Sequence, residues 1–136
     1  MDQQSWEVSL FALVLWREAR GETVDTKRVI AWTIKNRVLH PSWYGTDWSS
    51  VITKPEQYSS MTHSGDPNLV KWPLANDTSW MACMDIAAEV YGPGGVDLAQ
   101  GATHYYDSSM PAPPYWAEKM TLVSTQGRFH LYKQNY

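Results

Sequence analysis

A change in hydrophobic period along the chain is the feature that most constrains its fold. Apolar residues recur at helical spacing in three segments, residues 6–17, 25–39 and 79–91. Beyond residue 100 the period changes and predicts short strands at residues 102–106, 119–124 and 128–133. Helices that come first and strands that come last predict an α+β domain with a small antiparallel sheet near the C-terminus.

Turn-forming residues separate these segments. Residues 41–77 contain four prolines and two glycines, which predicts a loop-rich stretch with at most one short helical turn at residues 48–52. Pro41 is expected to end the second helix. Ser5 and Thr78 are the predicted N-caps of the first and third helices, and Gly21 is expected at or just beyond the end of the first.

Length and charge exclude several classes of protein. A chain of 136 residues fits one domain, taken here as residues 1–136, with one core. Its formal net charge of −3 offers neither the basic surface that nucleic acid needs nor a polybasic patch for anionic lipid. The apolar run at residues 10–16 is too short to span a bilayer, so no membrane insertion is expected.

Neither a metal nor another cofactor is predicted. The four histidines are scattered along the chain without the spacing of metal ligands. Cys83 is the single cysteine, so no intramolecular disulfide can form. Because it lies inside a predicted helix among Ala and Met, we expect a buried small apolar residue rather than a nucleophile.

The aromatic content points to a carbohydrate ligand. Eight Trp and eight Tyr occur, against two Phe. Trp and Tyr combine an apolar body with a polar group, which matches the apolar faces and polar edges of sugar rings. We expect most of the tryptophans to be structural and two or three to line a cleft.

Glu18 is the candidate catalytic residue. It lies near the C-terminal end of an otherwise apolar helix, where partial desolvation and the helix dipole both favour a protonated carboxyl. Cleavage of a glycosidic bond needs such a proton donor for the leaving oxygen. The structural alternative is an ion pair of Glu18 with Arg17 or Arg20.

A second catalytic carboxylate is harder to assign. Because Gly21 is expected to end the helix, Glu22 should not share the helical face of Glu18, and it is expected to be a structural partner of loop amides or of Arg37. A pair of catalytic carboxyls would lie about 5–10 Å apart across the sugar. The sequence does not choose among the other candidates, which are Glu56, Asp66 and Asp107.

Several motifs in order resemble one family. Residues 18–22 read EARGE and precede a helix that ends in NRV at residues 36–38. Further matches are VI at 51–52, QYS at 57–59, ATHYY at 102–106 and PYWA at 114–117, followed by Gly127 and Tyr132. Together they span about residues 10–133 and resemble the catalytic domain of the spore cortex-lytic enzymes, the SleB-like cell-wall hydrolases.

The resemblance implies a lysozyme-like fold related to goose-type lysozymes and lytic transglycosylases. It implies cleavage of the β-1,4 bond between N-acetylmuramic acid and N-acetylglucosamine in peptidoglycan, with Glu18 as the general acid. A lytic transglycosylase needs no second carboxylate, because the muramoyl 6-hydroxyl attacks the anomeric carbon and a 1,6-anhydro sugar forms. Hydrolysis by water on the same scaffold, as in a muramidase, is the alternative.

Five further residues are candidates for substrate binding. Gln57 and Tyr58 are predicted to face the cleft and hold a sugar N-acetyl group or Glu18, unless they only pack a loop. Tyr105 and Tyr106 must point to opposite faces of a strand, so one of them is expected near Glu18. His104 shares a face with Tyr106.

Rival functions differ in their chemistry or in their delivery. A wall amidase or peptidase would need zinc ligands or a Cys/His pair, and a non-catalytic glycan-binding module would leave Glu18 without a use.

A chain without a leader peptide suggests a phage endolysin, held in the host cytoplasm until its release to the periplasm or wall, or a virion protein with the same chemistry. The expected partner is the peptidoglycan glycan strand, and a monomer is expected because a long polymer needs an open cleft.

Overall fold

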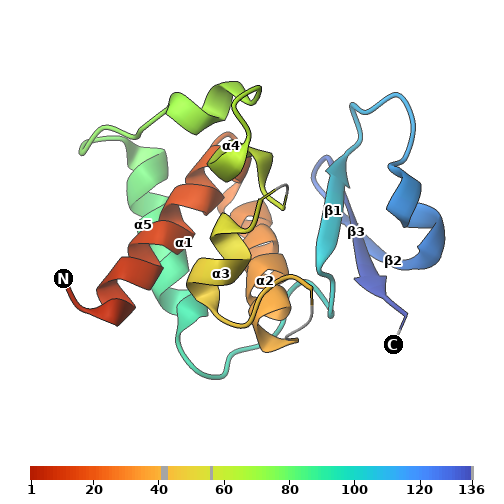
Figure 1. The fold of residues 1–136 in the computed structure, drawn as a ribbon, viewed down its shortest axis with the longest axis horizontal. Coiled ribbons are helices and arrows are strands. Elements are labelled where there is room, and N and C mark those ends of the chain that lie inside the picture. The colour runs from red at the N-terminus through yellow and green to blue at the C-terminus, as the bar shows by residue number, and fades with distance from the viewer. Residues whose placement is uncertain (41–42, 56, 136) are drawn as a thin grey trace.

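The computed structural model describes residues 1–40, 43–55 and 57–135. In these ranges the chain forms α-helices followed by a three-stranded antiparallel sheet, which confirms the predicted α+β class (Figure 1). The helices are α1 (Gln3–Ala19), α2 (Val24–Leu39), α3 (Trp48–Thr53), α4 (Ser59–Thr62) and α5 (Thr78–Tyr91), with 3₁₀ turns η1 (Pro67–Val70) and η2 (Tyr115–Lys119). The strands are β1 (His104–Asp107), β2 (Met120–Gln126) and β3 (Phe129–Gln134).

Helix α1 is the centre of the helical part. It packs against α2, α3, α4 and α5, and its apolar side chains Phe11, Val14 and Leu15 are completely buried. Burial of one such side chain contributes about 1.5–3 kcal/mol. This packing fixes the direction in which the last turn of α1 presents its polar side chains.

The sheet lies beside the helices, with strand order β1-β3-β2 (Figure 1). Strands β2 and β3 form a hairpin whose tight turn places Gly127 at φ +56°, a conformation that favours glycine. The turn approaches α2, since a Cβ added at Gly127 would lie 3.3 Å from the Thr26 hydroxyl. Phe129 and Leu131 of β3 are buried and belong to the same core as α1.

The expected helices occur with corrected ends. Helix α1 begins at Gln3 because Asp2, not Ser5, is its N-cap and accepts from the Ser5 amide at 2.7 Å. Helix α5 is likewise capped by Asp77 instead of Thr78. Gly21 follows the end of α1 as predicted, whereas Pro41 lies outside the described residues.

The central segment is more ordered than its prolines and glycines predict. The expected turn at residues 48–52 is helix α3, but α4 and η1 were not predicted. Both are four residues long, so neither has a hydrophobic period that a sequence pattern could reveal.

Within the described ranges no helix is long and apolar enough to cross a membrane.

Candidate active site

The carboxyl group of Glu18 joins three distant parts of the chain. Glu18 occupies the last turn of α1, and its Oε2 accepts a hydrogen bond from the Ser60 hydroxyl of α4 at 2.7 Å. Its Oε1 accepts from the Tyr105 hydroxyl of β1. The helical part and the sheet therefore meet at this carboxyl.

Both partners of Glu18 are hydroxyl groups, which can donate to a carboxylate and accept from a carboxylic acid. The same pair can thus hold Glu18 in either protonation state, as a group that gives and takes a proton requires. Burial raises the pKa of Tyr105 well above its usual value, with the charge of Glu18 as the second cause, so this phenol stays a neutral donor.

The alternative of an ion pair between Glu18 and a neighbouring arginine is wrong for the described residues. Arg17 turns away and donates to the carbonyl groups of Ser60 and Lys71, both at 3.1 Å. Arg20 donates to the Arg17 carbonyl and to the Asn68 side chain. The two carboxyl oxygens of Glu18 therefore accept hydrogen bonds from the hydroxyl groups of Ser60 and Tyr105.

Glu18 opens into a cavity of about 380 Å³ between the helices and the sheet. Four of the five predicted substrate-binding residues line it with Glu18: Gln57, Tyr58, His104 and Tyr105. The other lining residues are Arg37, Trp43, Tyr115, Trp116, Met120 and Gln134. Glu18 is the one carboxylic acid among the described lining residues.

Tyr106 is not part of this lining. Strand β1 alternates, so Tyr105 turns toward the helices and lies edge-on to Phe129 with ring centroids 5.4 Å apart. Tyr106 points to the other face, where it contacts Trp116 edge-on and stacks on His130 and Tyr132. His104 shares that face through its own contact with Trp116.

Gln57 and Tyr58 line the cavity, and each has one buried polar atom without a hydrogen-bond partner among the described residues. The Gln57 Nε2 donates to the carbonyl groups of Tyr44 and Val51, which fixes the orientation of the amide. The Gln57 Oε1 and the Tyr58 hydroxyl are buried and have no hydrogen-bond partner among the described residues. Burial raises the pKa of Tyr58 to about 12, so it remains a neutral phenol.

His104 is a neutral side chain in this site. Burial, with the nearby charge of Arg37, lowers its pKa to about 3. Its Nδ1 lies 2.9 Å from the Thr103 hydroxyl, and its ring contacts Trp116 with centroids 4.9 Å apart. His104 therefore contributes shape and hydrogen bonding near neutral pH, and no charge.

Two tryptophans line the cavity, Trp43 and Trp116, as the aromatic content led us to expect. Trp43 and the neighbouring Tyr115 are exposed, with 55% and 84% of their surfaces accessible. Exposed aromatic rings at the rim of a polar cavity suit the apolar faces of sugars. Motif reasoning missed Ser60, Trp43 and Trp116 as individual site residues, because only the fold brings them to Glu18.

The remaining carboxylates have other partners. Glu22 pairs with Arg128 at 2.6 Å, and Arg128 also pairs with Asp107 at 3.1 Å. The predicted pairing of Glu22 with Arg37 is wrong, because Arg37 donates to the Thr103 carbonyl at 2.6 Å. Asp66 accepts from the Ser59 hydroxyl and the Asn68 amide. Glu56, the remaining candidate, lies outside the described residues.

A metal centre finds no support in the described ranges, where no group of three or more His, Cys, Asp or Glu side chains could hold an ion. Cys83 is buried in α5, and burial raises the pKa of its thiol to about 11.

Two solved structures share this fold. The crystal structure of the catalytic domain of the Bacillus cereus SleB protein matches with a TM-score of 0.67 and 22% identity, covering 98% of this chain and 93% of the other. The catalytic domain of the germination-specific lytic transglycosylase SleB from Bacillus anthracis matches with the same TM-score and identity, covering 98% and 97%. This likeness establishes the SleB-like fold. No curated protein sequence matches the chain at a significant level.

A family model described as Cell Wall Hydrolase matches residues 21–132, which is most of the chain. The match begins three residues after Glu18, so the role of Glu18 is argued from its motif and geometry. A hydrolase family also favours an enzyme over a non-catalytic glycan-binding module. The chain belongs to the Cell Wall Hydrolase family.

Proposed function

We propose that this protein degrades peptidoglycan by cleaving the β-1,4 bond between N-acetylmuramic acid and N-acetylglucosamine, as a lytic transglycosylase with Glu18 as its acid and base. Residues 1–136 act as one catalytic domain in this proposal. The observation that carries it is the Glu18 carboxyl, held by two hydroxyls in a cavity rimmed with aromatic side chains. The SleB-like fold and the family match support the same substrate class.

The reaction needs one proton that leaves and returns. Protonated Glu18 gives its proton to the glycosidic oxygen as the bond to the muramoyl anomeric carbon breaks. The muramoyl 6-hydroxyl then attacks that carbon and passes its proton to the Glu18 carboxylate. A 1,6-anhydro ring forms, Glu18 is protonated again and no water is consumed.

The composition of the cavity favours this route over a two-carboxylate hydrolysis. A retaining or inverting glycosidase needs a second carboxyl about 5–10 Å from the first. Asp66, Asp107 and Glu22 do not line the cavity and are bonded elsewhere. Transglycosylation requires only one carboxyl group, and the described lining contains one, that of Glu18.

The cavity walls suggest how the substrate is held. The Gln57 Oε1 and the Tyr58 hydroxyl are buried without partners in the cavity wall, so a small side-chain shift on binding would let them accept from and donate to an N-acetyl group. Trp43, Tyr115 and Trp116 offer apolar faces for the sugar rings. Tyr106 stays a predicted contact, for rings that extend past Trp116.

Mass spectrometry of muropeptides released from purified peptidoglycan tests the proposal, with wild type beside Glu18→Gln. We expect 1,6-anhydro-muramoyl products from wild type and none from the variant. Reducing muramoyl ends that still depend on Glu18 would replace transglycosylation with muramidase hydrolysis. Cleaved peptide stems, or a fully active variant, would refute the proposal.

The biological setting is a separate proposal, in which a phage uses this enzyme as an endolysin from the host cytoplasm. The experiment is expression in bacteria with and without a membrane-permeabilising holin. Lysis only when both proteins are present is the expected outcome. Lysis by the enzyme alone would contradict retention in the cytoplasm.

A monomer in solution, measured by light scattering, is expected for an enzyme that admits a long polymer.

A further inference from the structure

Arg17 is a buried cation directly beside the catalytic candidate in sequence. Only 5% of its surface is exposed. Its Nη1 donates to the Ser60 carbonyl and its Nε to the Lys71 carbonyl, both at 3.1 Å, and Nη1 also contacts the Met61 sulfur at 3.5 Å. The guanidinium thus connects α4 to the segment that follows η1.

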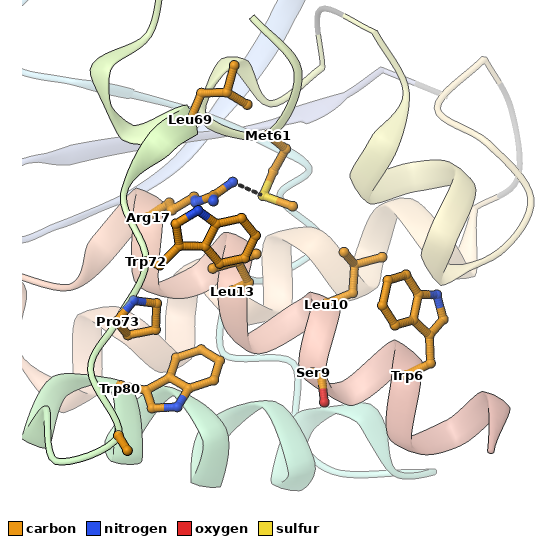
Figure 2. A pocket seen from close by; sticks show the side chains of 11 residues that line it. Trp6, Ser9, Leu10, Leu13, Arg17, Met61, Leu69, Trp72, Pro73 and Trp80 are labelled. Atoms are coloured by element: carbon orange, nitrogen blue, oxygen red, sulfur yellow. Dashed lines mark hydrogen bonds between the residues drawn. The ribbon is translucent and has the colours of Figure 1, made fainter. Parts of the chain in front are cut away.

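Trp72 holds the guanidinium from its outer side. The Arg17 Cζ lies 4.6 Å from the centroid of the Trp72 ring, within the range of a cation–π contact. Both side chains line a groove of about 660 Å³. Figure 2 shows them with Met61 above and Leu13 below. Trp72 is 68% exposed, and its ring contact with the Arg17 guanidinium lies at the wall of this groove.

Helix α4 depends on such contacts for its position. It has four residues, and its N-cap Tyr58 makes no side-chain capping bond. A single turn of helix is not stable alone, because nucleation costs more than one turn recovers. Ser60, at the centre of α4, is completely buried and donates to Glu18 at 2.7 Å.

The charge of Arg17 is expensive where it lies. Burial lowers its pKa, which the charge of Asp66 partly opposes. The four described ion pairs do not include Arg17, and its Nη2 is buried without a hydrogen-bond partner in the described ranges. A buried cation without a carboxylate at bonding distance costs stability, which an apolar side chain of similar size would avoid.

We propose that Arg17 and Trp72 form a clamp that positions Ser60 against the Glu18 carboxyl, which makes Arg17 a positioning residue for the reaction. This inference rests on the proposed role of Glu18. The clamp binds the backbone carbonyl of Ser60, while the hydroxyl of the same residue donates to Glu18. Loss of the clamp lets the Ser60 hydroxyl move away from Oε2.

Lys35 provides a matched control for Arg17→Met. Its surface is 6% exposed, its Nζ lies 4.6 Å from the Trp32 ring centroid, and it donates to the carbonyl groups of Gly92 and Gly94. Lys35 lines a different groove, and within the described ranges it makes no hydrogen bond, ion pair or cation–π contact with Glu18, Ser60 or Tyr105. Lys35→Met therefore removes a similar buried cation without affecting Ser60.

The first measurement is kcat for release of glycan fragments, together with the melting temperature. Arg17→Met is expected to lower kcat about 100-fold, the size of effect that misplacement of a catalytic group by about 1 Å produces. Lys35→Met is expected to keep kcat within about 3-fold of wild type, and the melting temperatures show whether the two variants are folded to the same extent. Equal kcat losses in the two variants would overturn the clamp.

A double-mutant cycle tests whether Arg17 acts through Ser60. Ser60→Ala alone should lower kcat and shift the limb of the pH–rate profile that reports the acid, and Arg17→Met should shift the same limb in the same direction. In the Ser60→Ala background, Arg17→Met should cost less than about 3-fold further. Multiplicative losses, or an unmoved pH profile in Arg17→Met, would overturn the proposal.

Trp72→Ala keeps the test decisive if Arg17→Met does not fold, since Trp72 is exposed. We expect kcat to fall about 3- to 30-fold, in line with the range of cation–π energies. Trp6→Ala, from the same groove but without a contact to Arg17, is the control and should retain kcat.

Glu18→Gln distinguishes failure of the proposed function from failure of the clamp. A fully active Glu18→Gln would refute the proposed function. An inactive Glu18→Gln together with a fully active Trp72→Ala would refute the clamp alone.

Discussion

Tyr105 of strand β1 donates a hydrogen bond to Glu18 of helix α1 across 87 residues of sequence. The bond ties the sheet to the last turn of the central helix, at the group that we propose as the acid. It fixes the Oε1 atom of the carboxyl, while Ser60 of α4 fixes the Oε2 atom.

Tyr105→Phe is expected to lower kcat about 10- to 100-fold, because a hydrogen bond to a charged group contributes about 1.5–3 kcal/mol. Kinetics on purified peptidoglycan measure the loss. Tyr91→Phe is the matched control, since the Tyr91 hydroxyl donates to Glu7 at 2.8 Å in another Tyr–Glu pair away from the cavity. Equal kcat in the two variants would exclude a role for the Tyr105 hydroxyl.

Glu22→Gln should leave activity within about 3-fold of wild type, in contrast to Glu18→Gln. Glu22, with 15% of its side chain exposed, pairs with the half-exposed Arg128, which keeps Asp107 as a partner, so the loss should cost about 1 kcal/mol of folding free energy. Parallel assays and urea denaturation of the two variants check this. A loss of activity in Glu22→Gln as large as that of Glu18→Gln would identify a second catalytic carboxylate.

Trp43→Ala should weaken glycan binding about 3- to 10-fold, in line with aromatic contacts of about 0.5–1.5 kcal/mol. Titration of a glycan fragment into inactive Glu18→Gln protein, with and without the Trp43 change, isolates binding from catalysis. The added change Trp6→Ala is the control, because Trp6 lines the other groove. Equal affinities in the Trp43 and Trp6 variants would remove Trp43 from the glycan site.

His104 should make the protein less stable in acid. Its pKa is lowered to about 3 in the folded protein, from an ordinary value of 6.5, so the unfolded chain binds a proton first as the pH falls. The contribution of neutral His104 to stability is present above pH 6.5 and is lost progressively toward pH 3. The slope for this one proton is at most about 1.4 kcal/mol per pH unit.

Urea denaturation between pH 7 and pH 4 compares wild type with His104→Asn. We expect the free energy of unfolding of wild type to fall more steeply in acid than that of the variant. Parallel pH dependences would show that His104 keeps its ordinary protonation in the folded protein.

The sequence was most informative where structure is local. The apolar spacing of residues 6–17 predicted α1, and Gly21 marked its end, so Glu18 could be placed in the last turn. The change of period likewise predicted strands at residues 119–124 and 128–133, which the structure joins through Gly127 and Arg128 into the β2–β3 hairpin. These features depend on neighbours within a few residues, which a pattern can capture.

The partners of Glu18 could not be predicted in the same way. Alternation along β1 implied that one of Tyr105 and Tyr106 faces inward, and the pairing of Tyr105 with Leu131, which is buried against the helices, decided which. Ser60 lies in a turn too short for any periodic signal, held by Arg17 from 43 residues away. Neither relationship has a trace in local spacing.

The sequence by itself determined the long helices α1, α2 and α5, the strands of the small sheet, and the presence of one well-placed glutamate in an aromatic-rich chain. Only the tertiary structure decided what that glutamate contacts, because its hydroxyl partners lie 42 and 87 residues away and arrive through the packing of α4 and the register of β1 on β3. Local propensity fixes an element, whereas a site between elements is fixed by the contacts that bury them together.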